Sequence, residues 1–362
     1  MMSYIKDDKM LNNKYFLWGA GTYGERIVDF MKNDLVFEGI IDNNPKKQGN
    51  MFRNLPVISY EEAKQFLPEK KIVITPAHPR VIQNTLLTDG FIRNKDFYTY
   101  HQFLPKYYWE KNRTVISLVG IVASTACNMN CKGCQTYADL SVGSSPPDAS
   151  KMKRDVDNMF NHADSIFFIV FNCGESLLYD EAVAEVASHI YENYQGRYHT
   201  MSVITNGTIV PSVDTLKKFA KSNVVFSVSD YPEHKKTRIE LIEKCNEHKV
   251  PLLLNSTCNT DGWHDFGDPR ILLDENPKKI QNGCWTANTE LYDGHLFLCA
   301  AQAWAEAVAG IGERKVGDSF DVSLPKSDEN REAFYRVISA QPENGYVSHC
   351  MRCNGMCTPF IK

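Results

Sequence analysis

The sequence predicts an α/β protein in which buried parallel strands alternate with crossover helices. From Val115 onward, apolar runs and helical stretches alternate with a period of about 30 residues. Most of the apolar runs are rich in Val, Ile, Leu or Phe, as strands buried on both faces require. The expected strands are 115–123, 165–171, 200–204, 223–228 and 250–255, and the expected helices are 149–162, 179–194, 212–221 and 233–248. Such a sheet is open or curled into a partial barrel, with its chemistry at the carboxyl ends of the strands.

Residues 14–110 predict a smaller α/β domain. A buried strand at 15–18 leads into a glycine turn and then a helical pattern. The glycines of this turn are Gly19, Gly21 and Gly24. A second strand, 37–41, ends at Asp42, 18 residues beyond Gly24. The alternation continues with extended pieces at 55–58 and 71–75 and helices at 60–67 and 79–88.

This order of glycine turn, helix and acidic strand end is that of a dinucleotide-binding βαβ unit, whose glycines bring backbone N–H groups close to a phosphate. With its Asp-Asn-Asn-Pro strand end (42–45) and Pro-Val-Ile piece (56–58), the segment also resembles the small Rossmann-like modules of surface-polysaccharide and nucleotide-sugar enzymes. At about 95 residues it is half of a full dinucleotide fold. Three interpretations stay open: a nucleotide or nucleotide-sugar site, an NAD site, or a structural or oligomerisation module. The aromatic-rich stretch 97–109 predicts a connector that packs between domains.

Composition and charge set limits on the function. The 362 residues are 43% hydrophobic and 23% charged, as in an ordinary soluble globular protein. A net charge of −4 gives no basic surface for nucleic acid. The N-terminus lacks the apolar core of a signal peptide, and no run reaches membrane-spanning length. Eleven cysteines without an export signal indicate metal or redox use and not a disulfide framework, so we expect a cytoplasmic protein.

Three cysteines follow the apolar run 115–122 directly. They are Cys127, Cys131 and Cys134, spaced by three and then two residues. Fe–S clusters are held by cysteine thiolates, and a cubane cluster usually takes four of them. Three thiolates on one loop therefore predict a [4Fe–4S] cluster with one iron open to a ligand. The alternative is a structural zinc loop completed by a distant Cys or His.

This cysteine spacing after a strand resembles the signature of the radical S-adenosylmethionine (SAM) enzymes, and the resemblance runs from Thr114 to the C-terminus. In that family the open iron chelates the amino and carboxylate groups of SAM. The signature usually has an aromatic residue before its last cysteine, where this chain has Gly133. The resemblance implies that the reduced cluster splits SAM into methionine and a 5′-deoxyadenosyl radical. That radical then takes a hydrogen atom from the substrate.

The ends of the later strands carry further candidate residues. After the second strand, Cys173, Gly174 and Glu175 occupy the place of the family's Gly-Gly-Glu-Pro motif, which holds the amino group of SAM. Glu175 is suited to accept a hydrogen bond from an ammonium, and the alternative is a helix-capping glutamate. By resemblance, contacts to SAM ribose or carboxylate are also expected at the ends of the third and fourth strands. Those candidates are Asn206, Ser227 and Ser229.

A second cysteine group follows. Cys284 and Cys299 flank a hairpin pattern with an Asp-Gly turn at 293–294, and Cys350 and Cys353 form a Cys-x2-Cys pair. Four thiolates close around one tetrahedral-thiolate centre, either zinc or an Fe–S cluster. The spacing resembles the auxiliary-cluster extensions of radical SAM enzymes called twitch and SPASM domains. The resemblance implies a second [4Fe–4S] cluster with Cys284, Cys299, Cys350 and Cys353 as its ligands.

The other cysteines receive different interpretations. Cys357 replaces one of the four ligands or has another role, and Cys258 lies after the fifth expected strand. A cysteine thiol with its weak S–H bond suits a hydrogen-atom donor, so both are candidate catalytic residues. Cys245 lies within a helical pattern and is expected in the core.

We therefore expect three domains: a Rossmann-like module at 1–112, a radical SAM partial TIM barrel at 113–268, and a twitch/SPASM-like domain at 269–362. The expected activity is dehydrogenation or epimerisation of a sugar or sugar nucleotide, with electrons from a donor such as flavodoxin or ferredoxin. The expected cofactors are two [4Fe–4S] clusters and SAM, without nucleic-acid or membrane partners. One alternative is a peptide- or protein-modifying radical SAM enzyme. A more distant alternative is a zinc-stabilised nucleotide-binding module without catalysis.

Overall fold

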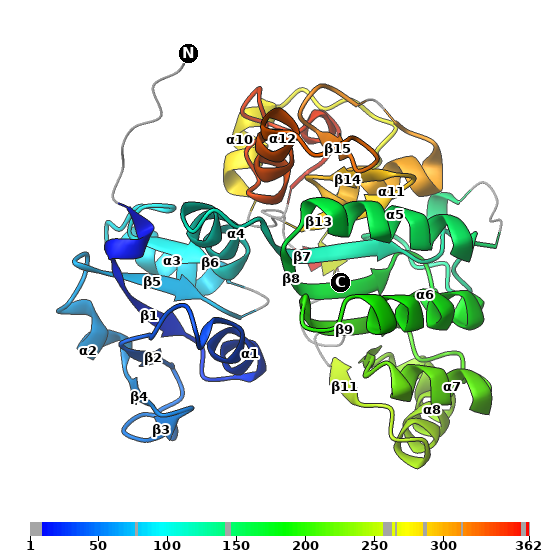
Figure 1. The fold of residues 1–362 in the computed structure, drawn as a ribbon, viewed down its shortest axis with the longest axis horizontal. Helices are drawn as coiled ribbons and strands as arrows, with labels where there is room; N and C mark the ends of the chain where they lie inside the picture. The colour runs from blue at the N-terminus through cyan, green and yellow to red at the C-terminus, as the bar shows by residue number, and fades with distance from the viewer. Residues whose placement is uncertain are drawn as a thin grey trace. The chain divides into compact units, whose positions relative to one another are not determined.

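The chain folds into two compact units, Met1–Ser117 and Leu118–Lys362 (Figure 1). The computed structural model describes residues 9–76, 79–141, 146–255, 263–264, 266–284, 288–312, 314–355 and 360–361. Each unit has its own sheet, in the order β3-β4-β2-β1-β5-β6 for the first and β11-β10-β9-β8-β7-β13-β14-β15 for the second. The mixed α/β class predicted from the sequence is confirmed.

The first unit is built on a mostly parallel sheet. Its strands are β1 (Lys14–Trp18), β2 (Gly39–Ile41), β3 (Met51–Phe52), β4 (Leu55–Ile58), β5 (Lys70–Ile74) and β6 (Phe97–Thr99). Its helices are η1 (Met10–Asn12), α1 (Thr22–Met31), α2 (Tyr60–Lys64), α3 (Arg80–Thr88) and α4 (Tyr100–Glu110). β1 lies between β2 and β5 and pairs with both in parallel, whereas β3 and β4 form an antiparallel hairpin.

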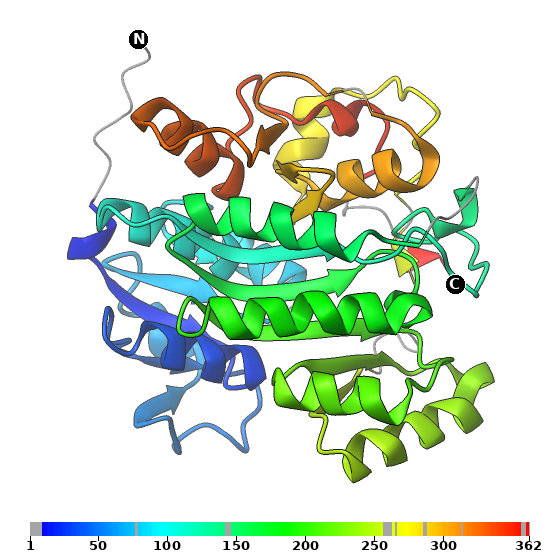
Figure 2. The same ribbon diagram turned by 45° about the vertical axis from the view of Figure 1, so that its right-hand side comes forward.

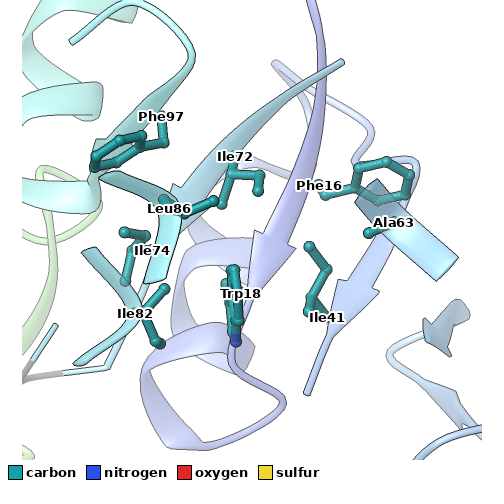
Figure 3. Close-up of a cluster of buried hydrophobic side chains, with 9 residues drawn as sticks. All are labelled: Phe16, Trp18, Ile41, Ala63, Ile72, Ile74, Ile82, Leu86 and Phe97. Atoms are coloured by element: carbon teal, nitrogen blue, oxygen red, sulfur yellow. The ribbon is translucent and has the colours of Figure 1, made fainter. Parts of the chain in front are cut away.

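Alternate residues of β1 face opposite sides of this sheet, and both sides are buried. Phe16 and Trp18 point into an apolar cluster under α2 and α3 (Figure 3). Its members are Phe16, Trp18, Ile41, Ala63, Ile72, Ile74, Ile82, Leu86 and Phe97. Tyr15 points to the other side, where its ring packs edge-on against Phe103 of α4 with centroids 4.8 Å apart. Burial on both faces explains why this strand reads as a continuous apolar run.

The aromatic stretch 97–109 completes the first unit, so our interpretation of it as a connector between domains was wrong. Phe97 is fully buried in β6, which pairs in parallel with β5. In α4, the hydroxyls of Tyr107 and Tyr108 donate to the backbone carbonyl and the carboxylate of Asp34, at 2.7 and 2.9 Å. The rings are therefore core of the N-terminal sheet.

The second unit begins with the predicted strand–helix alternation (Figures 1 and 2). Its first five strands are β7 (Val115–Val122), β8 (Ser165–Asn172), β9 (Tyr198–Thr205), β10 (Val225–Ser229) and β11 (Leu252–Asn255). The helices between them are α5 (Ala149–His162), α6 (Asp180–Asn193), α7 (Val213–Lys221) and α8 (Lys235–Glu247). Short 3₁₀ turns are η2 (Ala138–Leu140), η3 (Ser176–Tyr179) and η4 (Pro232–His234). β8 to β11 pair in parallel, so their carboxyl ends share one edge of the sheet.

Residues beyond 269 add strands to the same sheet. β13 (Thr289–Tyr292) pairs in parallel with β7, and β14 (His295–Phe297) and β15 (Ser319–Asp321) extend the sheet in antiparallel fashion. The remaining elements are β12 (Trp263–His264), α10 (Pro277–Gly283), α11 (Ala300–Ala309), α12 (Asp328–Ile338), η5 (Ser348–Met351) and β16 (Phe360–Ile361). The predicted hairpin is confirmed, with Asp293 and Gly294 at φ 49° and 74° in its turn.

Candidate active site

The first cysteine loop begins at the carboxyl end of β7, beside the end of β8. The backbone N–H of Ala123 donates to Asn172 O at 2.9 Å, and that of Glu175 donates to Ala126 O at 2.8 Å. Gly174 has φ +56°, and a Cβ there would lie 2.2 Å from Ala126 O. Only glycine allows this approach, so the motif after β8 holds the start of the cysteine loop in place.

The three thiols of this loop are free and partly exposed. Burial, followed by the nearby Cys134 and Cys127, raises the pKa of Cys131 to about 11. Burial also raises the pKa of Cys127, against the opposing effect of N–H groups that point at its sulfur. Met129 N and Asn206 Nδ2 lie 3.4 and 3.9 Å from that sulfur. This environment suits a thiolate ligand, because N–H donors stabilise the negative charge on its sulfur.

Glu175 is almost fully buried and is bound by protein groups on both oxygens. Oε1 accepts from Leu177 N at 3.0 Å and Thr205 Oγ1 at 2.8 Å, and Oε2 accepts from Asn206 N at 2.7 Å. Burial raises the pKa of Glu175, and these hydrogen bonds oppose the rise. Glu175 is thus the N-cap of η3, as the helix-capping alternative describes. A carboxylate has about four acceptor positions, so one remains for a ligand.

Of the other predicted SAM contacts, Asn206 is joined to the cysteine loop. Its Nδ2 donates to Asn128 Oδ1 at 3.0 Å, in addition to its contact with the Cys127 sulfur. Ser227 and Ser229 lie two residues apart on one face of β10, the latter at the carboxyl end of the strand. Cys173 is buried with φ 68°, directly after β8. The strand-end residues therefore gather at the edge that carries the thiols.

The second group of thiols also converges. Cys284 ends α10, Cys299 precedes α11, and Cys350 lies in η5. Burial raises the pKa of Cys299 to about 12, with Cys284 as the next contribution. Burial raises the pKa of Cys350 as well, followed by the effects of Cys299, Cys284 and Cys353. The four cysteines expected to form one centre therefore lie within electrostatic range of one another.

Two polar side chains, the half-buried Gln281 and the buried Asp318, hold these segments together, and the sequence did not point to either. Gln281 Oε1 accepts from Val347 N at 3.2 Å and from Cys350 Sγ at 3.3 Å, which fixes α10 to η5. Asp318 accepts from Ser348 N at 3.1 Å through Oδ1 and from Gln302 Nε2 at 3.3 Å through Oδ2. The one feature of the sequence that could have pointed to Gln281 is its position one helical turn before Cys284.

Across the described ranges, no group of three or more His, Cys, Asp or Glu side chains is arranged to hold a single metal ion. Tetrahedral zinc with 2.3 Å bonds needs sulfur atoms about 3.8 Å apart. A multi-iron cluster takes each thiolate on a separate iron. Cys127, Cys131 and Cys134 are of the ligand type that such a cluster takes, and N–H donors lie at the Cys127 sulfur.

Three further predictions concern the other cysteines. Cys258 and Cys357 lie outside the described residues, so their roles as hydrogen-atom donors stay predictions. Cys245 is fully buried in α8, and its expected place in the core is confirmed. Burial raises its pKa to about 12.

The glycine turn of the first unit is closed by its own side chains. Asp42 Oδ2 accepts from Ala20 N at 2.9 Å and from Lys47 Nζ at 3.2 Å, and Oδ1 accepts from Asn44 N at 2.9 Å. Lys47 Nζ also donates to Ala20 O at 2.7 Å. In a dinucleotide site an acidic residue at this place binds the ribose. Here Asp42 holds the turn itself, which favours the structural alternative for this module.

The three glycines of this turn have different surroundings. Gly19 has φ +124°, and its N–H donates to Ile41 O at 2.8 Å. A Cβ at Gly24 would lie 2.0 Å from Gly19 O, so this glycine lets α1 pack onto the turn. A Cβ at Gly21 would meet nothing within 4 Å. Gly21 is therefore the position of the turn that is open to a ligand.

Comparisons with known proteins give weak likenesses. No protein-family model matches the chain, and no curated protein matches it. Native anSMEcpe with bound AdoMet aligns at TM-score 0.32 and 20% identity over 39% of this chain, which spans 43% of the anSMEcpe chain. BtrN in complex with AdoMet and 2-DOIA aligns at TM-score 0.43 and 17% identity, over 67% of this chain and 95% of BtrN.

HydG, a maturase of the [FeFe]-hydrogenase, aligns at TM-score 0.30 and 14% identity, over 65% of this chain and 52% of that chain. A search of the described helices for one long and apolar enough to cross a membrane finds none.

Proposed function

We propose that the chain is a radical SAM enzyme that holds one [4Fe–4S] cluster on Cys127, Cys131 and Cys134. The observation that carries the proposal is the gathering of these thiols with Glu175 and Asn206 at one sheet edge. When bound, such a cluster supplies the electron that cleaves SAM to methionine and a 5′-deoxyadenosyl radical. Three thiolates leave one of four irons without a protein ligand, which is the position SAM requires.

The chain's own residues would position SAM. Glu175 keeps one acceptor position for the SAM ammonium, beside the backbone of Cys173 and Gly174. The Asn206, Ser227 and Ser229 side chains supply hydrogen bonds for ribose or carboxylate. The Met129 and Asn206 N–H groups at the Cys127 sulfur stabilise its thiolate.

We assign Cys284, Cys299, Cys350 and Cys353 to a second [4Fe–4S] cluster. Four thiolates leave no iron open, so this centre suits electron transfer and not substrate binding. Such a cluster can accept a second electron from the substrate, and this supports dehydrogenation. An epimerase would need a hydrogen-atom donor instead of an electron acceptor. We propose a sugar or sugar nucleotide as substrate, with flavodoxin or ferredoxin as the reductant. The single four-thiol centre supports the sugar or sugar-nucleotide substrate by analogy with the twitch-like extensions.

One observation favours the peptide-modifying alternative. β11 is the last strand of the described sheet on that side, and Leu253 and Leu254 are 42% and 50% exposed. An exposed strand edge with apolar side chains is a surface to which an extended peptide adds as a further strand. A substrate peptide bound there would lie along β11, whose carboxyl end shares a sheet edge with those of β8, β9 and β10.

The test is reductive SAM cleavage by anaerobically reconstituted full-length protein with dithionite. Replacing Cys127, Cys131 and Cys134 together by Ala should abolish 5′-deoxyadenosine and remove about half of the bound iron, since each of two clusters takes its own thiolates. Cys245→Ala is the matched control. It should keep both 5′-deoxyadenosine formation and the bound iron, because Cys245 is a buried core residue of α8. A triple variant that still forms 5′-deoxyadenosine would end the proposal.

A further inference from the structure

Glu290 on β13 and Asn172 on β8 meet across the strand that separates them. The sheet order is β8-β7-β13, so their strands are two strand spacings apart, about 10 Å. Glu290 is 0% exposed and lies directly opposite Gly120 of β7, where a Cβ would be 1.9 Å from Glu290 Oε2. Because Gly120 has no side chain, the Glu290 carboxyl crosses β7 and comes within 3.4 Å of Asn172 Nδ2.

One proton completes the hydrogen bonds of these two side chains. Asn172 Nδ2 donates to Glu290 Oε2, and the buried oxygens Glu290 Oε1 and Asn172 Oδ1 have no donor elsewhere in the described residues. An ionised carboxyl has no proton to give, so both oxygens would stay unpaired. A neutral carboxyl donates to Asn172 Oδ1 and accepts from Asn172 Nδ2, which closes an acid–amide pair with two hydrogen bonds. The indole of Trp304 on α11 is a further donor to the carboxyl.

The surroundings of the pair favour the neutral acid. Burial raises the pKa of Glu290 to about 8, and the hydrogen bonds from Trp304 and Asn172 oppose the rise. β7 faces the carboxyl with Gly120 and α11 faces it with Trp304, neither of which titrates. The end of β8 adds Cys173, whose thiol is also neutral because burial raises its pKa. At pH 7 most Glu290 side chains therefore carry the proton that the pair needs, and at pH 9 most have lost it.

The acid–amide pair anchors the start of the turn that follows β8. Asn172 is the last residue of β8, and its backbone oxygen accepts from Ala123 N at 2.9 Å, where the first cysteine loop begins. The next two residues, Cys173 and Gly174, have φ 68° and 56°. A residue other than glycine takes this left-handed conformation at a cost in free energy and keeps it only where its surroundings hold it. Glu175, the proposed contact to the SAM ammonium, follows this turn directly.

We propose that Glu290 is a positioning residue for SAM, and that it acts as a neutral acid paired with Asn172. The pair fixes the turn that presents Glu175, so loss of the Glu290 proton weakens SAM binding without contact between Glu290 and SAM. This role rests on the proposed radical SAM function. The acid–amide pair itself rests only on the contacts within the sheet.

The test compares wild type with Glu290→Gln, whose amide donates to Asn172 Oδ1 without titrating. SAM dissociation constants are measured by equilibrium dialysis at pH 7 and pH 9 on anaerobically reconstituted full-length protein. The two proteins are compared at the same pH, because the SAM amino group also titrates in this range. We expect the ratio of the wild-type constant to the variant constant to rise about fivefold from pH 7 to pH 9, the effect of one buried hydrogen bond. Glu329→Gln, at an exposed position of α12, is the control and should follow wild type.

Hydrogen exchange of the Ala123 amide reports on the end of β8 without SAM. Exchange in wild type, relative to Glu290→Gln, should become faster from pH 7 to pH 9. A constant ratio of SAM dissociation constants would overturn the positioning role, and a constant ratio of exchange rates would overturn the acid–amide pair.

Reductive SAM cleavage is measured on the same protein, so that failure of this proposal is distinguished from failure of the radical SAM assignment. If the exchange rates separate with pH but neither protein binds SAM, the acid–amide pair stands and the radical SAM assignment falls. If SAM is bound and cleaved while both ratios stay constant, the radical SAM assignment stands and the role of Glu290 falls.

Discussion

Tyr137 Oη lies 3.0 Å from His349 Nε2, although the two residues are 212 positions apart in the chain. Tyr137 follows the first cysteine loop, and its backbone N–H donates to Cys134 O at 3.0 Å. His349 precedes Cys350 in η5, and burial lowers its pKa to about 4, so its ring is neutral. One hydrogen bond between two buried side chains thus joins the segments that carry the two groups of thiols.

Breaking this bond should weaken the folded second unit. Tyr137→Phe leaves the buried His349 nitrogen unpaired, which costs about 1–3 kcal/mol in the free energy of unfolding. In a double-mutant cycle with His349→Leu, we expect a coupling of about 1 kcal/mol. Denaturant unfolding of the iron-free protein measures it, because bound clusters break two-state behaviour. Additive single effects would show that the two side chains do not interact.

Gln281 should control how firmly the second centre is held. Gln281→Ala removes the acceptor that binds Val347 N, so η5 loses this backbone tie to α10. We expect iron to be lost from the second centre to a chelator about fivefold faster, the effect of roughly one hydrogen bond. Lys279→Ala on the exposed side of the same helix is the control. Equal rates in the two variants would contradict the positioning role.

Asp42 should hold the glycine turn in the absence of any nucleotide. Burial raises the pKa of Asp42, but hydrogen bonds from Asn44, Ala20 and Lys47 outweigh it and the pKa is lowered, so the carboxylate is stabilised in the folded state. Asp42→Asn in the full chain should speed amide hydrogen exchange in β1 and the start of α1 about tenfold, since hydrogen bonds to a charged group are lost.

The control for this exchange experiment is Asp29→Asn, because the Asp29 carboxylate is exposed and paired with Arg53. It should leave the exchange of β1 unchanged. If Asp42→Asn leaves exchange unchanged but abolishes binding of a sugar nucleotide, the carboxylate serves a ligand and the structural interpretation is wrong.

Local patterns in the sequence were enough to find the strands and helices between residues 115 and 255. Four of the five strands β7 to β11 are apolar runs, β9 being the exception. The Asp293-Gly294 turn marks a hairpin. These signals depend only on neighbours in the chain. Cysteine spacing likewise grouped thiols that raise one another's pKa in the structure, and their role as cluster ligands stays a prediction. The stretch 97–109 was misread because its rings bury against β1 and β5, and helix α4 forms despite Pro105 within it.

Contacts between distant segments could not be found in this way. Glu290 reads as an ordinary charged strand residue, and only the pairing of β13 with β7 places it over Gly120. His349, Gln281 and Asp318 have partners that lie far from them in sequence, so no spacing rule identifies them. Single-sequence reasoning therefore located the thiols and missed the polar groups that position them.

The buried Glu290 should make the stability of the second unit depend on pH. Its pKa is raised from 4.5 to about 8, mainly by burial, so the folded state keeps a proton that the unfolded state releases. Between these two values the folded state binds more protons, and the free energy of unfolding falls as pH rises. The slope is at most about 1.4 kcal/mol per pH unit for one group. Below about pH 4 and above about pH 9, both states carry the same charge at this position and the slope vanishes.

Glu290→Gln isolates this effect, because the amide has nearly the same shape and does not titrate. Unfolding of wild type and variant is measured side by side from about pH 5 to about pH 8, the range that the two pKa values define. We expect wild type to lose stability relative to the variant across this range. Glu62→Gln, in the first unit, should leave the pH dependence of the second unit unchanged. Parallel curves for wild type and Glu290→Gln would mean that folding does not raise the pKa of Glu290.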